Sequence, residues 1–138
     1  MWRIELMPWE QARAYATPIR FAVFVEEQGV PAEIEMDESD AKCVHALAFE
    51  GTRAVATGRL LPDGHIGRMA VLKEFRGKGL GGAVLKKLME AAKNRGDRAV
   101  ALSAQVHAVA FYRAHGFEPV GEVYEEAGIP HQAMRRSL

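Results

Sequence analysis

The stretch VLKEFRGKGLGG, residues 71–82, decides the fold and the chemistry to expect of this chain. It begins at the end of an apolar strand pattern, contains four glycines in six residues, and ends where a helical pattern starts. A helix N-terminus carries unpaired N–H groups and partial positive charge, and glycines let a phosphate approach them closely. Arg76 and Lys78 add mobile positive charge. The stretch therefore predicts a site for a phosphate or a pyrophosphate.

Two other interpretations of this loop compete with a phosphate site of that kind. A glycine-rich turn that only joins a strand to a helix is disfavoured, because each glycine loses much conformational entropy on folding. A dinucleotide site has the matching spacing Gly77-x-Gly79-x-x-Gly82, but it belongs after the first strand of a parallel unit, with an acid about 20 residues further on. Here the next strand ends at residues 103–105, Ser-Ala-Gln. A triphosphatase loop is excluded, because no Gly-Lys-Ser/Thr follows at the required spacing.

Upstream of the loop, three strand patterns follow one another at residues 42–50, 53–61 and 65–72. Tight connections at Gly51 and at residues 62–64, Pro-Asp-Gly, predict an antiparallel meander.

Before these strands, residues 2–7 alternate as a short strand. A helix is expected to start at Thr17-Pro18, with a hydroxyl N-cap and proline at the first helical position. It is expected to run to about Gln28, with Gly29 as its left-handed terminator. The acidic stretch 33–40 is interpreted as a loop or a short helix.

Downstream, apolar residues from Leu80 to Ala92 recur at spacings of three and four, which predicts an amphipathic helix ended by Gly96. A strand is expected at 98–103, a helix at 106–115 closed by Gly116, and strands at 117–120 and 133–136. The crossover from 65–72 to 98–103 should be right-handed and make these two strands parallel. The fold class is therefore α/β (α+β): a mixed, mostly antiparallel sheet of about six to seven strands flanked by about four helices.

The bulk composition restricts the function classes. The 138 residues suit a single domain, 1–138, and 49% hydrophobic with 26% charged residues is an ordinary globular balance. Eighteen basic and eighteen acidic side chains give no net charge, which argues against nucleic-acid or membrane partners. Without a signal-like or membrane-length apolar run, a cytoplasmic location is expected. Cys43 is interpreted as a buried thiol.

Two motifs resemble one known family. Arg76-x-x-Gly79-x-Gly81 resembles the phosphate-binding loop of the GNAT superfamily of N-acetyltransferases. Residues 105–117, Gln-x-x-Ala-x-x-x-Tyr-x-x-x-Gly-Phe, resemble its second signature, with glutamine in place of the usual asparagine. The resemblance extends from Trp2 to Arg136. The stretches 24–28, 102–105 and 128–131 look like the ElaA-like branch of that family.

The resemblance implies a function and a set of site residues. The expected reaction moves the acetyl group of acetyl-CoA to a primary amine by direct transfer in a ternary complex, with acetyl-CoA as co-substrate and no metal. Tyr112 matches the general acid that protonates the departing thiolate, and Gln105 matches a cofactor contact. The remaining expected cofactor contacts are Met69, Ala70 and Val71 for the pantetheine arm, and Arg76, Gly77, Lys78, Gly79, Leu80, Gly81 and Gly82 for the pyrophosphate.

Several questions stay open at this stage. The alternatives to catalysis of this kind are a non-catalytic acetyl-CoA-binding or sensing domain and transfer of a longer acyl group. The acceptor is a small-molecule or peptide amine; acidic residues in 26–40 and 122–126 favour a cationic one. The protein could be a monomer or a homodimer. The candidate general bases are Glu27, Glu33, Glu35, His45, Glu122 and His131.

Overall fold

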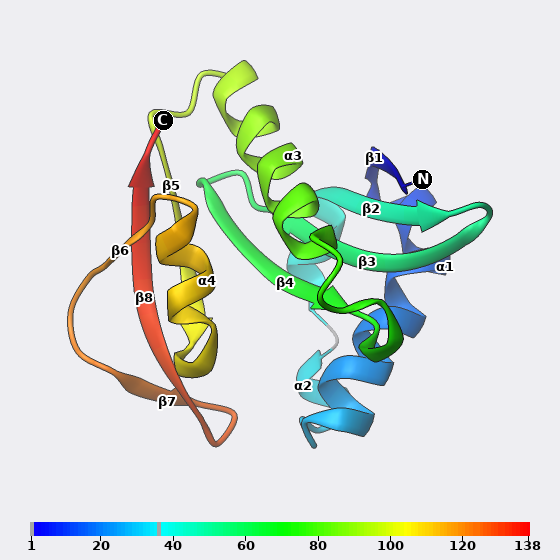
Figure 1. Cartoon of the computed structure of the whole chain (residues 1–138), viewed down its shortest axis with the longest axis horizontal. Helices are drawn as coiled ribbons and strands as arrows, with labels where there is room; N and C mark the ends of the chain where they lie inside the picture. The colour runs from blue at the N-terminus through cyan, green and yellow to red at the C-terminus, as the bar shows by residue number, and fades with distance from the viewer. Residues whose placement is uncertain (1, 36) are drawn as a thin grey trace.

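The computed structural model describes residues 2–35 and 37–138, which form one eight-stranded sheet with helices on both faces (Figure 1). The sheet order is β1-β2-β3-β4-β5-β8-β6, and β7 pairs with β8. The strands are β1 Trp2–Pro8, β2 Val44–Glu50, β3 Arg53–Leu60, β4 His65–Val71, β5 Ala99–Gln105, β6 Glu118–Pro119, β7 Tyr124–Glu126 and β8 Ile129–Ser137.

The sheet is mostly antiparallel, as the sequence predicts. Strands β2, β3 and β4 form the expected meander, and β4 with β5 is the expected parallel pair. One strand, β7, was not expected. It is exposed along its length and has the sequence YEE, so it lacks the apolar alternation that marks a half-buried strand. The last strand, β8, is also longer than the predicted 133–136 and pairs with all seven residues of β5.

The first helix corrects one prediction. Helix α1 is Trp9–Arg20, so Pro18 lies inside it rather than at its first position. The chain continues as a π-helical segment, η1, Phe21–Glu27. Proline removes one N–H and crowds the carbonyl four residues before it, and a π-helical turn is one way for a helix to absorb such a disturbance. Gly29, with φ +74°, follows the segment as expected.

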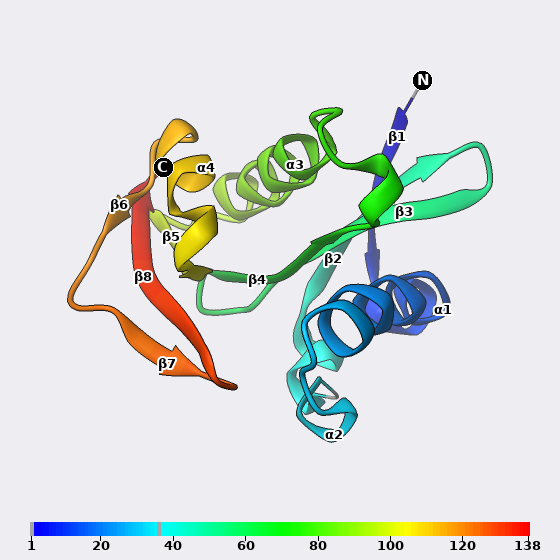
Figure 2. The ribbon, with the colours of Figure 1, turned by 60° about the horizontal axis from the view of Figure 1, so that its bottom comes forward.

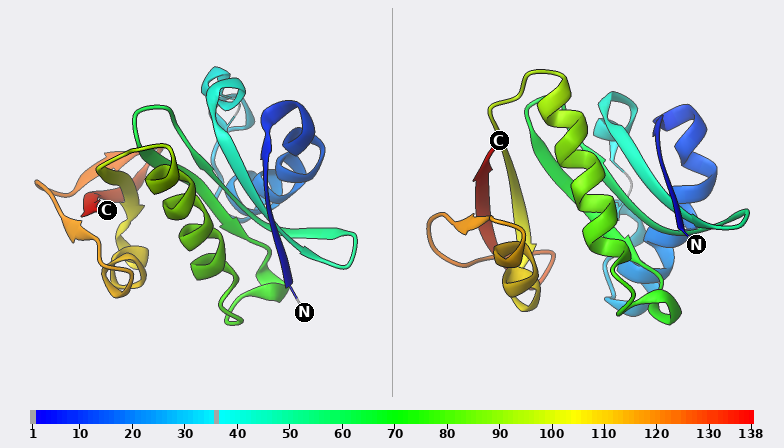
Figure 3. Two further views of the ribbon diagram at one scale, coloured as in Figure 1. Left: turned by 90° about the horizontal axis from the view of Figure 1, so that it is seen from above. Right: turned by 45° about the horizontal axis from the view of Figure 1, so that its top comes forward.

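Two apolar cores lie on opposite faces of the sheet. Helix α3, Leu80–Asn94, packs on one face with buried Val84, Leu85 and Leu88. Helix α1 covers the other face with Ala12, Ala16 and Ile19, against Leu47 and Phe49 of β2 and Ala70 of β4. Figures 2 and 3 show α3 and α1 on either side of the strands. Helix α1 contacts strands β1 to β4. On this face of the sheet, strands β5 and β8 are therefore less covered.

The remaining elements are short. The acidic stretch contains a single helical turn, α2 Ala32–Glu35, and a 3-10 turn, η2 Glu38–Lys42; Met36 lies outside the described residues. The predicted helix at 106–115 is a 3-10 turn, η4 Val106–Ala108, followed by α4 Val109–Ala114, and the 3-10 turn η3 Lys73–Phe75 follows β4. In the part of the chain that the structure describes, no helix combines the length and the apolarity needed to cross a bilayer.

Candidate active site

The sheet opens between its two parallel strands. Strands β4 and β5 pair only through His65 with Ala101 and Ile66 with Leu102, and then they diverge. The divergence begins at a bulge, because Thr57 pairs with Ala70 and Arg59 with Gly67, which sets two residues of β4 against one of β3. Figure 1 shows β4 and β5 separating toward the end of β4. The second half of β4 is therefore an edge inside the sheet.

Val71 presents its peptide groups to this opening. The N–H of Leu72 donates to the carbonyl of Val55 in β3 at 2.9 Å. Because successive residues of an extended strand direct their peptide groups to opposite edges, the N–H and C=O of Val71 point toward the opening. The Nε of Arg76 confirms this direction, since it donates to the carbonyl oxygen of Val71 at 3.0 Å.

The glycine loop turns from this edge into helix α3. Gly77 and Gly79 have φ +78° and +81°, the left-handed region that favours glycine, and a Cβ at either position would meet nothing within 4 Å. Gly79 caps the helix without any side-chain hydrogen bond. Among the described residues, the first amide of the helix with a backbone acceptor is that of Ala83, which donates to Gly79 at 3.1 Å. The preceding amides are thus available to an anion.

The start of α3 lies against α4. A Cβ on Gly81 would lie 3.5 Å from the ring of Phe111 and 3.7 Å from a methyl of Val71. A Cβ on Gly82 would lie 3.1 Å from the ring of His115. The end of β4, the glycine loop and α4 therefore meet at one place, and the absence of a side chain on Gly82 allows the close approach to His115.

Tyr112 is in α4 beside this junction. Its ring lies edge-on to Phe111 and Phe117, with centroid distances of 5.0 and 5.9 Å, and the residue is 8% exposed. Burial raises the pKa of Tyr112 to about 12. The phenol is therefore neutral at any pH at which the protein works, and it can donate a hydrogen bond.

Gln105 is at the open end of β5, and its side-chain amide meets that of Gln28, just after η1. Nε2 of Gln105 donates to Oε1 of Gln28 at 2.8 Å, and Nε2 of Gln28 donates back to Oε1 of Gln105 at 3.3 Å. This reciprocal pair links the two halves of the sheet at the open end. Gln28 was not predicted as a site residue, because nothing local in the sequence indicates a partner 77 residues away.

The side chain of Arg76 folds back onto the surface of the protein, where it is 40% exposed, rather than projecting freely from the loop. Its Nη1 and Nη2 donate to the two carboxylate oxygens of Glu27 at 2.6 and 2.8 Å. These hydrogen bonds lower the pKa of Glu27, so this candidate base holds a proton less readily than an ordinary glutamate. Lys78 is exposed, and the positive charge available to a phosphate comes from Lys78 and the helix end.

Two more candidate bases, Glu35 and His45, lie in or next to a buried ionic cluster. We define this cluster as Arg20, Glu35, Asp37, Asp40 and Arg59. Glu35 is 4% exposed and accepts from the Nε of Arg20. His45, next to the cluster, donates from Nε2 to the carbonyl of Asp40 at 2.9 Å, and burial lowers its pKa. Both groups are structural.

The last three candidate bases lie elsewhere. Glu33 in α2 and Glu122 before β7 are exposed. His131 in β8 is 7% exposed, pairs across the strands with Gln105, and donates from Nδ1 to the carbonyl of Ile129 at 2.7 Å. This tautomer leaves a lone pair on its Nε2.

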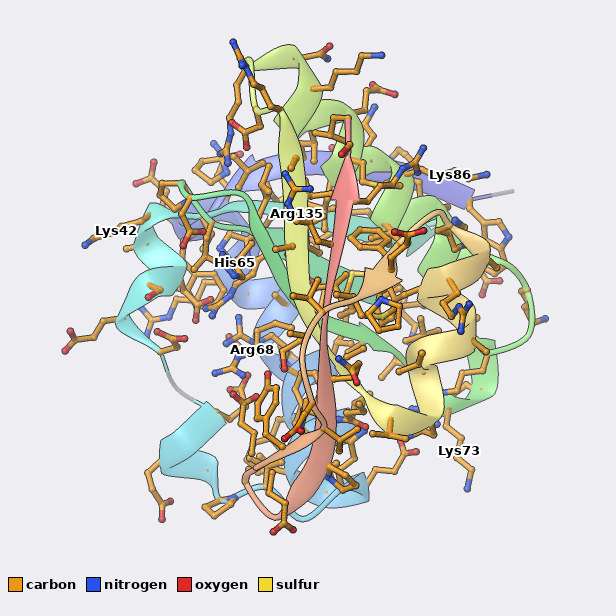
Figure 4. All side chains as sticks on the ribbon, turned by 90° about the vertical axis from the view of Figure 1, so that its left-hand side faces the viewer. Lys42, His65, Arg68, Lys73, Lys86 and Arg135 are labelled. Carbon is orange, nitrogen blue, oxygen red and sulfur yellow. The ribbon has the colours of Figure 1, made fainter. Side chains whose placement is uncertain are left out.

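One side chain in this region was not predicted from the sequence. Arg68 is the bulged residue of β4, with φ +51°, a conformation that L-residues other than Asn and Asp rarely adopt. Figure 4 labels Arg68, whose side chain is 28% exposed and forms a long ion pair with Asp37. The only local signal was an arginine inside an otherwise apolar strand, HIGRMAV.

A mixed sheet that splays after its parallel pair, with a glycine loop leading into a helix at the opening, defines an acyl-CoA N-acyltransferase architecture. The family described as "Acetyltransferase (GNAT) domain" matches residues 11–138. The chain is 40% identical to the uncharacterized N-acetyltransferase YjcF of Bacillus subtilis, over 86% of this chain and 87% of that protein. It is 38% identical to protein ElaA of Escherichia coli, over 87% and 84% of the two chains.

Solved structures agree with the sequence comparison. A crystal structure of a Lactobacillus plantarum protein, described as a putative N-acetyltransferase, has a TM-score of 0.91 at 30% identity and covers 99% of this chain and 98% of that one. The Pseudomonas aeruginosa acyl-CoA N-acyltransferase and E. coli ElaA each have a TM-score of 0.88 at 33% identity, with 99% of both chains covered.

The chain therefore belongs to the GNAT family of acetyltransferases and is similar to ElaA within it. It is an N-acetyltransferase, an enzyme class whose members with this fold use CoA-derived substrates.

Proposed function

We propose that this enzyme transfers the acetyl group of acetyl-CoA directly to a primary amine while both substrates are bound. The observation that carries the proposal is the continuous path from the free edge of β4, at Met69, Ala70 and Val71, into the unpaired amides at the start of α3. A strand edge of this kind suits the amides of a pantetheine arm, and a helix N-terminus suits a pyrophosphate. These backbone groups suit the pantetheine arm and the pyrophosphate of acetyl-CoA and support the proposal for these two parts of the molecule.

Each part of the path has a distinct task in the proposal. Met69 to Val71 hold the arm as an added strand, and Gln105 reaches it from the opposite side of the opening. The backbone of residues 76–82 and the ammonium of Lys78 hold the pyrophosphate. Arg76 acts as a positioning residue, because it fixes the loop against Val71 and Glu27.

The acetyl thioester that acetyl-CoA supplies is an activated acyl group, and the protein has to stabilise charge as it reacts. The N–H of Val71, directed into the opening, is placed to donate to the oxyanion that develops on the carbonyl. Tyr112 donates its hydroxyl hydrogen to the departing sulfur. With a pKa of about 12, Tyr112 is a weak acid for protonating a thiolate whose free thiol has a pKa of ~8.5. Burial in the site would also raise the pKa of the CoA thiol, and this reduces the difference between the two pKa values.

The amine has to lose a proton before it attacks. Because Glu27 is paired with Arg76, and Glu35 and His45 are engaged inside the fold, the candidates that remain are Glu33, Glu122 and His131. His131 fits best, since its Nε2 keeps a lone pair when Nδ1 donates to Ile129 and since it pairs with Gln105; Nε2 also lies 3.7 Å from a carboxylate oxygen of Glu126. No side chain needs to carry the acetyl group, and burial raises the pKa of the Cys43 thiol, which makes it a poor nucleophile.

Calorimetry with acetyl-CoA tests the binding part of this proposal. We expect micromolar binding to the wild type and a loss of more than about tenfold in Gly79→Glu, because a carboxylate then faces the phosphates. The matched control is Gly51→Glu, another glycine with positive φ and open space around its Cβ, but in the turn between β2 and β3. Absence of binding to the wild type, or equal weakening in both variants, contradicts the proposed site.

A second measurement tests the role of Tyr112. In Tyr112→Phe we expect acetyl-CoA to bind as in the wild type, while CoA release in the presence of an amine mixture slows by about 10²–10⁴-fold. An unchanged rate removes the general acid from the mechanism.

A further inference from the structure

Arg68 holds hydrogen-bond donors that the fold does not use. Its Nε is buried and has no hydrogen-bond partner among the described residues. Its nearest ion pair joins Nη2 to Oδ2 of Asp37 at 3.5 Å, too long for a good hydrogen bond. A guanidinium has five N–H donors in a planar fork that matches a carboxylate, and each donor left unpaired away from water costs free energy.

The buried ionic cluster does not need Arg68. Arg20 donates from Nη1 and Nη2 to the two oxygens of Asp40, each at 2.9 Å. Arg59 donates to Asp40 and to Asp37, both at 2.8 Å, and Asp37 also accepts from the N–H of Ser39 at 2.8 Å. Burial alone would raise the pKa of Asp37, but these hydrogen bonds lower it to about 2. Asp37 is therefore satisfied by Arg59 and Ser39.

Among the described residues, the Nε of Arg59 is also buried without a hydrogen-bond partner, but both Nη atoms of Arg59 donate to carboxylates, whereas Arg68 makes only its long ion pair with Asp37. The side chain of Arg68 is 28% exposed, whereas that of Arg20 is 2% and that of Arg59 is 9% exposed. Burial, together with the positive charges of Arg59 and Arg20, lowers the pKa of Arg68. A nearby anion would stabilise its charge.

The bulge directs Arg68 to the face of the sheet on which an acceptor has to lie. Met69, the next residue, packs on the α3 side, because a Cβ on Gly58 would lie 2.5 Å from its sulfur. Arg68 contacts Asp37 on the opposite side, next to α1 and α2. It thus precedes the free edge at Met69–Val71 by a single residue.

The other half of the sheet presents polar groups on this same face. Leu102, Ala104 and Met134 of β5 and β8 belong to the core under α3. The alternating residues therefore face away from that core, among them Gln105 and His131. The hydrogen bonds between Gln105 and Gln28 confirm the direction, since Gln28 follows the segment that continues α1.

We propose that Arg68 binds a carboxylate of the acceptor, so that the physiological substrate is an amine that also carries a carboxylate, such as an amino acid or a peptide end. The inference rests on the proposed acetyl transfer and adds the acceptor class to it. One end of the acceptor is then held by the guanidinium while its amine faces the edge at Val71 and the Nε2 of His131. Arg68 acts as a specificity-determining residue in this arrangement.

The ion pairs of this region argue against the cationic acceptor that the acidic residues in 26–40 and 122–126 favoured. Three of the carboxylates counted toward an acidic rim, those of Glu35, Asp37 and Asp40, are paired with arginine. A fourth, Glu27, is paired with Arg76. Their charge is thus compensated inside the protein and does not attract a second cation.

Conjugates that join both substrates test the inference without knowledge of the acceptor side chain. CoA is linked through S-CH2-CO to the nitrogen of glycine, β-alanine or γ-aminobutyrate, and each conjugate is paired with its neutral carboxamide. Calorimetry on the wild type should show that at least one carboxylate conjugate binds about tenfold or more tightly than its amide, the effect of a charged hydrogen-bonded pair.

The variants locate this preference. In Arg68→Gln the carboxylate conjugate and its carboxamide should bind with about equal affinity, while acetyl-CoA binds as in the wild type. The control is Arg135→Gln, which replaces an exposed arginine on β8 (Figure 4); it should keep the wild-type preference for the carboxylate. If Arg68→Gln does not fold, Arg68→Lys should lower this preference, because a lysine cannot bind a carboxylate through two parallel hydrogen bonds. Equal affinities for all three pairs in the wild type, or a preference that survives these changes, overturn the inference. Failure of acetyl-CoA itself to bind would instead refute the proposed function.

Discussion

Replacing Asp40 by asparagine tests how the buried ionic cluster supports this half of the fold. The Asp40 carboxylate is 3% exposed and accepts three charge-assisted hydrogen bonds, two at 2.9 Å from Arg20 and one at 2.8 Å from Arg59. Asp40 is therefore shared by two guanidinium groups that have almost no contact with water. Each of these also pairs with a second carboxylate, Arg20 with Glu35 and Arg59 with Asp37. Asparagine keeps the shape but removes the charge and turns an NH2 group toward these donors.

The expected loss follows from that environment. Removing one partner from a buried ion pair costs about 3–5 kcal/mol, and here three charge-assisted hydrogen bonds from buried guanidinium groups lose their acceptor, although Glu35 and Asp37 still pair with the two arginines. A domain of this size has a free energy of unfolding of about 5–15 kcal/mol, so Asp40→Asn should remove about a fifth of it or more. The salt bridge between Arg68 and Asp37 does not replace the lost Asp40 carboxylate, because it supplies no acceptor to Arg20 or to Nη1 of Arg59.

Urea denaturation at pH 7 measures this loss as a lower midpoint at an unchanged slope. The control is Glu90→Gln, whose carboxylate is 63% exposed and 3.8 Å from Lys87; its effect should stay within about 0.5 kcal/mol. Burial would raise the pKa of Asp40, but the arginine hydrogen bonds prevail and lower it. The stabilisation is therefore present above the unfolded pKa of ~3.9 and is lost as the pH falls through the folded value.

The difference between wild type and Asp40→Asn should accordingly shrink on acidification below pH ~4. A loss of less than about 1 kcal/mol at pH 7 would refute the reasoning, because it would mean that the two arginines find water or another acceptor at no cost.

Two further predictions concern the edge of β4 and the buried phenol. Gly58→Ala should lower the free energy of unfolding, measured by thermal unfolding, by about 1–3 kcal/mol, because the new Cβ would lie 2.5–3.0 Å from Met69, Leu88 and Val84. In the control Gly67→Ala the new Cβ has nothing within 4 Å, so the free energy of unfolding should change little. Equal effects of the two substitutions would contradict this packing. Burial raises the pKa of Tyr112 to about 12, so the native state keeps the phenol proton at a pH at which the unfolded state has lost it. Between pH ~10 and 12 the free energy of unfolding should therefore fall more steeply in the wild type than in Tyr112→Phe. Parallel pH curves for the two proteins would show that Tyr112 titrates as an ordinary exposed tyrosine.

The sequence predicts those parts of the fold that depend on local backbone chemistry. The meander is marked by its turns, and Gly51 and Gly64 indeed have positive φ. The start of α1 was missed because Pro18 resembles a helix-starting proline, whereas the burial of Ala12 and Ala16 against the sheet holds the preceding turns in the helix. Tertiary packing outweighs the local signal there.

The candidate site divides in the same way. The glycine loop was interpreted from the glycine spacing of one segment, and Tyr112 from the resemblance of one segment to a family signature; both remain predictions as site residues. The pairing of Gln28 with Gln105, the pairing of Arg76 with Glu27 and the bulge at Arg68 depend on segments that meet only in the folded chain. A bulge arises from the register between two strands, which a single sequence does not reveal.

The hydrogen bond from Arg76 to the carbonyl of Val71 has a consequence for solubility. A free strand edge is a template on which another chain can add a strand, and proteins protect such edges with charged side chains. Here the edge must stay open for a narrow ligand, so it cannot be covered permanently. A single guanidinium, held by Glu27, occupies the end of that edge. If the loop binds a phosphate as proposed, the same Arg76 side chain would also shield this strand edge from pairing with another chain while no ligand is bound.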